Sequence, residues 1–310
     1  MTNTKPKILA VVGPTASGKT ELSLRLAEAL NGEILSCDSM QVYRGMDIGT
    51  AKPSLAERRG IPHHLIDVAD PDEPFSCADY KRLAEEAIAD VLARGKTPIF
   101  CGGTGLYLDA VLKVSTFSPD VPEGLREELM KEDPDRLWDE LCEVDPEAAA
   151  SMHKNNAKRV IRALEIYRGT GKTKTEWDRL SLQEESRYDT LVIGLDYRDR
   201  QTLYDRIDLR VDLMMADGLP EEAEALALDR ASTAGQAIGY KELYLWLDGA
   251  LSREEAVDLL KKNTRHYAKR QLTWFRRNPD TRWFFLDEGE REAIFENIVN
   301  IAKNHLNETL

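Results

Sequence analysis

The amino-acid sequence predicts an α/β protein whose core is a parallel sheet flanked by helices. Short apolar runs at 7–12, 32–39 and 97–105 alternate with amphipathic stretches at 18–30 and 75–95. Strands and helices in alternation are typical of a parallel sheet, because each parallel connection crosses over through a helix. The first and third runs lead into glycine turns, and ligands of such sheets bind beyond these carboxyl ends of the strands.

The rest of the chain divides by the spacing of its apolar residues. We predict a core at 1–120, a helical insertion at 121–188, and a segment at 189–310 that returns to the core and then becomes helical. The insertion has helical spacing with little strand signal, whereas residues 189–197 again resemble a buried strand. Further helices are predicted at 199–217, 219–230, 240–249 and 252–276, and an edge strand at 282–286.

Composition and charge narrow the class of protein. The net charge of −13 argues against nonspecific binding of nucleic acid by the whole surface. No apolar run approaches the roughly 18 residues that span a bilayer, and the N-terminus lacks a signal-peptide pattern. The four cysteines show no C-x-x-C spacing, so we expect reduced thiols rather than a zinc or redox site. We therefore expect a cytoplasmic protein.

The segment GPTASGKT matches the phosphate-binding pattern G-x-x-x-x-G-K-[ST]. Its glycines let backbone N–H groups face an anion, Lys19 can reach terminal phosphate oxygens, and Thr20 can ligate Mg²⁺. Because the segment lies between a predicted strand and a predicted helix, the fold is predicted to be P-loop NTPase-like. The predicted phosphate-binding residues are Gly13, Pro14, Thr15, Ala16, Ser17, Gly18, Lys19 and Thr20.

A typical nucleotide hydrolase also has a strand that ends in a Mg²⁺-linked aspartate. The strand pattern at 97–102 ends in Gly102 instead, and the pattern at 189–196 ends in Asp196 only after the helical insertion. Asp196 is interpreted as a polar residue at a strand end, with a metal-linked role as the alternative. The phosphate cradle therefore need not serve ATP hydrolysis.

Polar residues after two other predicted strands are candidates for chemistry at the same edge of the sheet. Asp38 directly follows the second apolar run, where a carboxylate can act as a general base or metal-linked ligand, or simply cap a turn. Thr104 can donate its hydroxyl to a phosphate or cap a helix. Gln41 could contact a planar ring, and the glycines and Lys52 that follow it suggest a loop that closes over a ligand.

Two basic stretches, 153–177 and 261–277, interrupt the acidic background and interleave cations with aromatic residues. They predict a nucleic-acid surface, although each alone could be a solvated helix face. Arg206 and Arg210 lie four residues apart on one face of a predicted helix. They could grip a phosphate or form salt bridges to neighbouring aspartates.

In this order, the motifs resemble those of the bacterial tRNA dimethylallyltransferases, also called tRNA isopentenyltransferases. The resemblance extends from Lys7 to about Leu286. It rests on GPTASGKT, SCDSMQVYRGMDIGTAKP, PHHLIDVADPDEPFSCADY, GGTGLY, NNAKRVIRALEIY, RIDLRVDLMMADGL, AIGYKE and KRQLTWFR.

The resemblance implies transfer of a dimethylallyl group from dimethylallyl diphosphate to N6 of the adenosine at tRNA position 37, with release of pyrophosphate. The phosphate cradle would then hold the donor's diphosphate with Mg²⁺. Asp38 would be the general base, and Thr104, Arg206 and Arg210 would stabilise the departing diphosphate. The implied partner is the anticodon stem-loop of tRNA, and we expect a monomer. The implied tRNA contacts are Asp38, Ser39, Met40, Gln41, Thr104, Arg126, Asn156, Ala157, Lys158, Arg159, Val160, Gly239, Tyr240, Lys241, Arg270, Gln271, Trp274 and Arg276.

Two other functions fit parts of the sequence. A small-molecule P-loop kinase or an adenylate prenyltransferase fits residues 1–110 but leaves the basic stretches without a role. A noncatalytic RNA-binding protein with a nucleotide-sensing loop fits the basic stretches but leaves Asp38 and Thr104 without a role.

Overall fold

The computed structural model describes residues 5–112, 121–122, 124–181 and 186–307. The chain forms two compact units. The first combines Met1–Val111 with Tyr188–Leu310, and the second is Leu112–Arg187. Within the described residues, no helix combines the length and the apolar character needed to cross a membrane.

The first unit is built on a six-stranded sheet in the order β3-β2-β4-β1-β5-β6, whose described strand pairs are all parallel. The central strand β1 is buried from Ile8 to Val12, as expected for a strand covered on both faces. The predicted fold class is therefore confirmed, including an edge strand at the predicted place. The strands are β1 (Lys7–Val12), β2 (Gly32–Cys37), β3 (His63–His64), β4 (Thr97–Gly102), β5 (Asp189–Asp196) and β6 (Arg282–Phe285).

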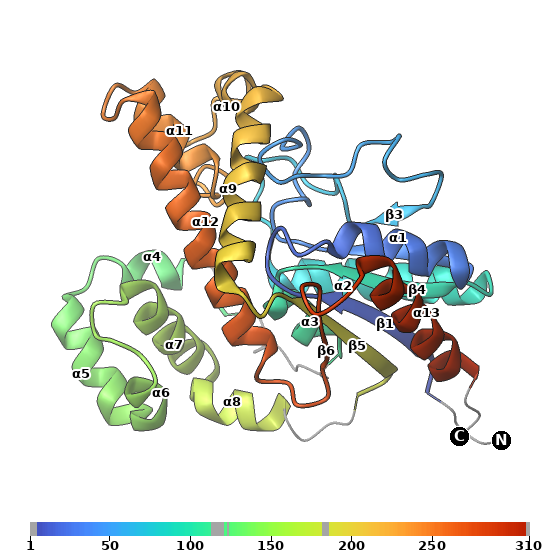
Figure 1. Cartoon of the computed structure of the whole chain (residues 1–310). Helices are drawn as coiled ribbons and strands as arrows, with labels where there is room; N and C mark the ends of the chain where they lie inside the picture. Colours follow the sequence, from blue (N-terminus) through green and yellow to red (C-terminus); the bar gives the residue numbers. More distant parts are fainter. Residues whose placement is uncertain (1–4, 113–120, 123, 182–185, 308–310) are drawn as a thin grey trace. The chain divides into compact units, whose positions relative to one another are not determined.

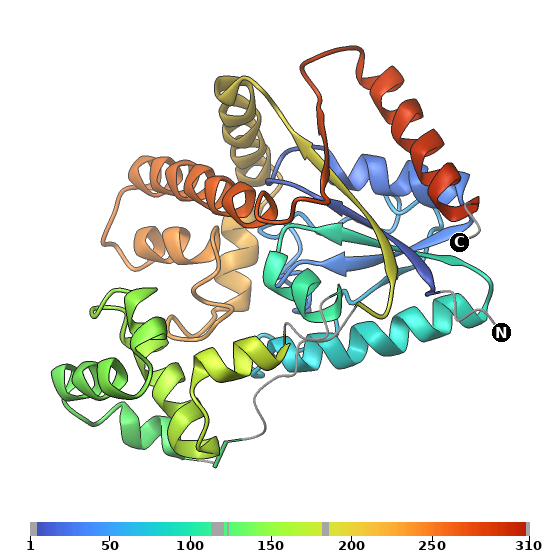
Figure 2. The same cartoon turned by 90° about the horizontal axis from the view of Figure 1, so that it is seen from below.

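Helices cover both faces of this sheet. Figure 2 shows α1 and α13 on one face and α2 on the other. The C-terminal helices α9 to α12 stand beside the carboxyl ends of the strands, and α12 is packed against α9 and α11 (Figure 1). The helices are α1 (Lys19–Ala29), α2 (Cys77–Ala93), α3 (Gly105–Leu112), α9 (Arg200–Ala216), α10 (Leu219–Leu226), α11 (Tyr240–Leu247), α12 (Arg253–Phe275) and α13 (Arg291–Asn307).

The described secondary structure of the second unit consists of helices joined by turns. Its core contains Leu129, Leu137, Leu141 and Leu164, which come from three different helices. Asp145 caps α6 by accepting from the Ala148 N–H at 3.1 Å, and it also accepts from the Thr175 hydroxyl at 2.6 Å. The helices are α4 (Leu125–Leu129), α5 (Pro134–Val144), α6 (Pro146–Ala150), α7 (Ala157–Thr170) and α8 (Lys174–Ser181).

Candidate active site

The phosphate loop connects β1 to α1 at the carboxyl end of the sheet. Gly13 and Gly18 have φ angles of 144° and 88°, which side chains rarely allow. A Cβ on Gly13 would lie 2.3 Å from the Leu195 carbonyl oxygen. No side chain of the described residues caps the start of α1, so the first N–H groups of this helix remain available to an anion.

Lys19 places a cation inside this loop. Its Nζ donates to the Pro14 carbonyl at 2.6 Å. The pKa of Lys19 is lowered to about 8, mainly by burial; the charge of Arg210 also lowers it, whereas those of Cys101 and Asp38 act in the opposite direction. The protein alone therefore disfavours the charged form of Lys19, and a bound anion would stabilise the protonated ammonium.

Arg206 and Arg210 reach the same region from α9. The Arg206 Nε donates to the Ala16 carbonyl of the phosphate loop at 3.0 Å. Within the described residues, Arg210 has no hydrogen bond or ion pair; burial lowers its pKa and the charge of Asp38 raises it. Arg210 is therefore a second cation beside the loop that lacks a carboxylate partner.

Arg206 and Arg210 do not form the alternative salt bridges to the aspartates of their own helix, which lies entirely within the described residues. Those aspartates have other partners. Asp208 accepts from Arg265 at 2.7 Å, and Asp212 is paired with Lys261 at 2.6 Å, so both carboxylates are used by α12. Asp205 accepts from Gln201 at 2.7 Å.

Asp38 and Thr104 lie at the ends of the neighbouring strands β2 and β4. Asp38 Oδ1 accepts from the N–H groups of Met40 at 2.9 Å and Gln41 at 3.4 Å. Oδ2 has no hydrogen bond among the described residues. Thr104 Oγ1 accepts from the Ser39 N–H at 3.0 Å, so it holds the turn that carries Asp38. One oxygen of Asp38 thus caps the turn, and the other is left for chemistry.

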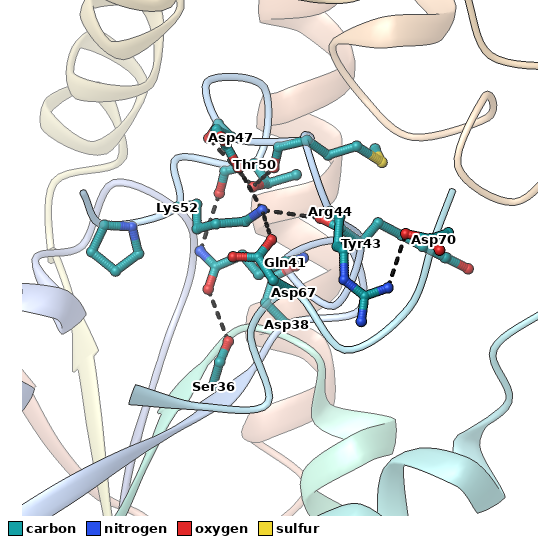
Figure 3. Close-up of polar contacts among 12 residues, drawn as sticks. Ser36, Asp38, Gln41, Tyr43, Arg44, Asp47, Thr50, Lys52, Asp67 and Asp70 are labelled. Carbon is teal, nitrogen blue, oxygen red and sulfur yellow. Dashed lines mark hydrogen bonds and ion pairs between the residues drawn. The ribbon is translucent and has the colours of Figure 1, made fainter. Parts of the chain in front are cut away.

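The Gln41 amide is used inside the protein. Its Oε1 accepts from the Ser36 hydroxyl at 2.8 Å, and its Nε2 donates to the Thr50 and Ala51 carbonyls at 3.2 and 3.4 Å (Figure 3). The side chain therefore braces the turn after β2. The ring or tRNA contact predicted for Gln41 would have to compete with these bonds.

The loop after Gln41 is folded around Lys52, whose side chain is only 3% exposed. Its Nζ donates to the Tyr43 carbonyl at 2.9 Å and pairs with Asp47 at 2.5 Å and Asp67 at 2.6 Å (Figure 3). Glu222 accepts from the backbone N–H groups of residues 47–49. These bonds hold the segment in the conformation seen in this structure, and closure of this loop over a ligand stays a prediction.

Gln271 lies between the phosphate loop and the turn after β4. Its Oε1 accepts from the Thr15 N–H at 2.9 Å, and its Nε2 donates to the Gly103 carbonyl at 3.0 Å. The side chain is buried.

Tyr267 is a site residue that the sequence analysis missed. Burial raises the pKa of its hydroxyl and the charge of Asp38 adds to this, while hydrogen bonds with Thr104 and Gln271 oppose it. The hydroxyl therefore lies among the predicted catalytic groups. The signal was its position four residues before Gln271, which puts both side chains on one helix face.

Asp196 at the end of β5 is fully buried and fully paired. It accepts from Arg200 at 2.8 and 2.9 Å, from Arg276 at 2.9 Å, and from the Tyr197 N–H at 2.8 Å. These contacts fit the interpretation as a polar strand-end residue. They also occupy Arg276, for which a tRNA contact was predicted, in an ion pair.

Burial corrects two of the predicted tRNA contacts. Val160 is 2% exposed and belongs to the core of the second unit. Tyr240 is fully buried, and its hydroxyl donates to Glu222 at 2.6 Å. Their side chains are core, because an apolar or aromatic residue on a helix is more often packed than exposed. Gly239 is buried too, and Lys241 lies 3.7 Å from Glu242.

Other predicted tRNA contacts are on the surface of their own units. Ala157, Lys158 and Arg159 are exposed at the start of α7, where Asn156 accepts from the Arg159 N–H at 3.4 Å. Arg126 is half exposed and pairs with Glu165 at 3.3 Å. Arg270 is exposed on α12, whereas Trp274 donates to Asp109 at 3.1 Å. Among the described residues, no cluster of three or more histidine, cysteine or acidic side chains could hold a metal.

Comparisons with known proteins agree with this geometry. A model of the family described as IPP transferase matches residues 41–278, and one described as isopentenyl transferase matches residues 6–72. The tRNA dimethylallyltransferase of Thermoanaerobacter sp. strain X514 is 46% identical over 97% of this chain and 99% of its own. The chain belongs to the tRNA dimethylallyltransferase family. The predicted resemblance is therefore confirmed.

Solved structures extend the comparison. The full-length tRNA isopentenylpyrophosphate transferase from Bacillus halodurans is 47% identical, with 97% of each chain covered and a TM-score of 0.73. A eukaryotic dimethylallyltransferase acting on tRNA is 32% identical over 97% of this chain and 79% of its own, with a TM-score of 0.86. As a tRNA dimethylallyltransferase family member, the chain has the fold of these enzymes along nearly all of its length.

Proposed function

We propose that this enzyme transfers the dimethylallyl group of dimethylallyl diphosphate to N6 of the adenosine at position 37 of tRNA, releasing pyrophosphate. One observation carries the proposal. Two cations, Lys19 and Arg210, lie at the phosphate loop without an ion pair to any carboxylate in the described part of the chain, and the charge of Asp38 raises the pKa of both. A diphosphate supplies the negative charge that these cations lack.

The groups at this edge of the sheet supply an acceptor for the proton and positive charge for the leaving group. The bond between the donor's C1 and its diphosphate oxygen breaks, and a bond between C1 and N6 of adenine forms. The N6 proton goes to Asp38, whose Oδ2 has no partner among the described residues. Lys19, Arg210 and the loop N–H groups stabilise the charge that develops on the departing diphosphate.

Mg²⁺ fits the same loop. Thr20 is exposed at the start of α1. The absence of an acidic cluster among the described residues fits a cation that is bound mainly by substrate oxygens and water, as Mg²⁺ usually is. Thr20 would hold the ion, which would neutralise part of the diphosphate charge.

The acceptor we propose is the anticodon stem-loop of tRNA. Two segments of this acidic chain carry exposed cations, which can bind the phosphates of an RNA. They include Lys158 and Arg159 on α7, Lys269 and Arg270 on α12, and Arg277 just after α12. The alternative of a small-molecule kinase leaves these cations without a role. The target adenine has to leave its stack before N6 reaches Asp38, so the tRNA is proposed to bind with that base flipped.

The test follows label from dimethylallyl diphosphate into unmodified tRNA that carries adenosine at position 37, with Mg²⁺ present. ATP and free AMP serve as controls. Label in tRNA without ATP, abolished by EDTA, is the expected result. Label in AMP alone would move the protein to the small-molecule prenyltransferases, and ATP consumption without transfer would make the loop a nucleotide site.

A further inference from the structure

We propose that Gln271 is a positioning residue that sets the spacing between the diphosphate loop and the Asp38–Thr104 edge of the site, rather than a residue that contacts tRNA. The inference rests on the proposed function, since it concerns how the donor and the acceptor's base are aligned. It replaces the tRNA contact that the family resemblance implied for this residue.

The contacts of one amide carry the argument. Its oxygen accepts from Thr15 in the phosphate loop at 2.9 Å, and its nitrogen donates to Gly103, next to Thr104, at 3.0 Å. The oxygen and nitrogen of an amide are fixed in one plane, so the two loops are held at one distance from each other. Gln271 is buried on a helix of 23 residues, which gives this brace a rigid base.

Glycines in the turn after β4 are required by the same helix. A Cβ on Gly103 would lie 1.9 Å from the Gln271 Nε2, and a Cβ on Gly105 would lie 2.1 Å from the Trp274 ring. Trp274 also donates to Asp109 of α3 at 3.1 Å. The glycines on either side of Thr104 thus allow α12 to press against this turn.

The consequence is kinetic. Thr104 holds the turn that carries Asp38 through the Ser39 N–H, so a shift of Gly103 moves the proposed base relative to the donor. A displacement of about 1 Å between reacting groups can lower a rate about 100-fold. A direct tRNA contact, in contrast, would lower affinity for tRNA.

The test compares Gln271→Met, which keeps the length but removes both hydrogen bonds, with Asp258→Asn at an exposed position of the same helix outside the basic stretch. We expect single-turnover transfer at saturating substrates to fall about 100-fold in Gln271→Met, by the displacement argument. The dissociation constant for tRNA should be unchanged in Gln271→Met, and Asp258→Asn should match the natural enzyme in both readouts.

A second set of variants makes the test independent of folding problems in Gln271→Met. Gly103→Ala should lower the transfer rate because its methyl group displaces the amide. In the double variant Gly103→Ala/Gln271→Ala the methyl group has room, so the loss should be no larger than for Gln271→Ala alone.

Multiplied losses in the double variant would contradict the proposal. So would normal transfer in Gln271→Met with weakened tRNA binding, which would restore the direct contact. If the natural enzyme itself transferred no label to tRNA, the proposed function would fail instead, and the two failures are therefore distinct.

Discussion

Asp38 and Asp196 both lie at the carboxyl ends of parallel strands, yet their surroundings differ. Asp196 ends β5 and is closed off by Arg200, Arg276 and the Tyr197 N–H. Asp38 follows β2 and accepts two backbone N–H groups on one oxygen only. A carboxylate with all its acceptor sites filled anchors structure, whereas one with an open oxygen beside Lys19 and Arg210 can accept a proton.

The same contrast applies to the arginines at the two strand ends. Arg200 and Arg276 both form ion pairs with Asp196, whereas Arg210 has no ion-pair partner among the described residues. Ion pairing inside the protein therefore separates anchoring cations from those that are available to a substrate anion. The predictions below test this separation.

Among the cation variants, the largest effect is expected for Arg210→Gln. Removing a preorganised donor to a departing anion typically lowers the rate about 100- to 1,000-fold. Arg210 makes no hydrogen bond or ion pair within the described ranges that its replacement would break. Single-turnover transfer checks this. Arg265→Gln on the neighbouring helix is the control, because Arg265 is already paired with Asp208. Equal losses in both variants would remove the distinction between paired and unpaired cations.

A pH dependence of donor binding is expected from Lys19. Because burial lowers its pKa to about 8 from 10.5, the free enzyme loses this proton above that pH and donor binding must restore it. The dissociation constant for dimethylallyl diphosphate should then rise by up to about tenfold per pH unit above pH 8. Calorimetric titrations between pH 7 and 9.5 measure this. Lys19→Arg keeps its charge and should not show the rise; the same slope in both proteins would contradict the assignment.

The lowered pKa of Lys19 also makes the free energy of unfolding depend on pH. The unfolded chain, with a pKa near 10.5, binds more protons than the folded chain between about pH 8 and 10.5. This residue alone therefore makes the free energy of unfolding rise with pH in that window.

The smallest effect on chemistry is expected for Asp196→Asn. Loss of charged hydrogen bonds to Arg200 and Arg276 should lower the free energy of unfolding by about 1–3 kcal/mol. The transfer rate per folded molecule should stay close to that of the natural enzyme. Chemical denaturation and single-turnover assays on the same preparation separate the two. A large loss of rate in fully folded Asp196→Asn would place this carboxylate in the reaction.

Local patterns predicted most of the fold. The apolar run at 7–12 corresponds to β1, and the helical spacing at 252–276 corresponds to α12. Both were predictable because the periodicity of a strand or helix sets which neighbouring residues are apolar. The strand β3 is only His63–His64, too short to leave such a pattern. The predicted phosphate loop and Asp38 lie together because parallel strands bring their ends to one edge.

Local sequence patterns could not predict which of the candidate site side chains are bound or buried inside the folded protein. Gln271 looked like a polar group available to RNA, but its amide is bound to Thr15, 256 residues away, and to Gly103, 168 residues away. The amide of Gln41 is bound too, by partners five to ten residues away that the turn after β2 brings onto it. Val160 and Tyr240 lie in motifs that resemble those of the family, yet packing places both side chains inside. Asp38 and Asp196 show the same strand-end pattern, and only distant arginines distinguish them.

The most direct test of this account compares Asp38→Asn with Asp196→Asn in one experiment. Both proteins are saturated with tRNA and labelled dimethylallyl diphosphate, and a single turnover is followed with the folded fraction measured in parallel. We predict that Asp38→Asn binds tRNA normally and transfers about 100- to 10,000-fold more slowly, the usual range for loss of a general base. Asp196→Asn should transfer normally per folded molecule. Near-normal transfer by folded Asp38→Asn would contradict its role as the base.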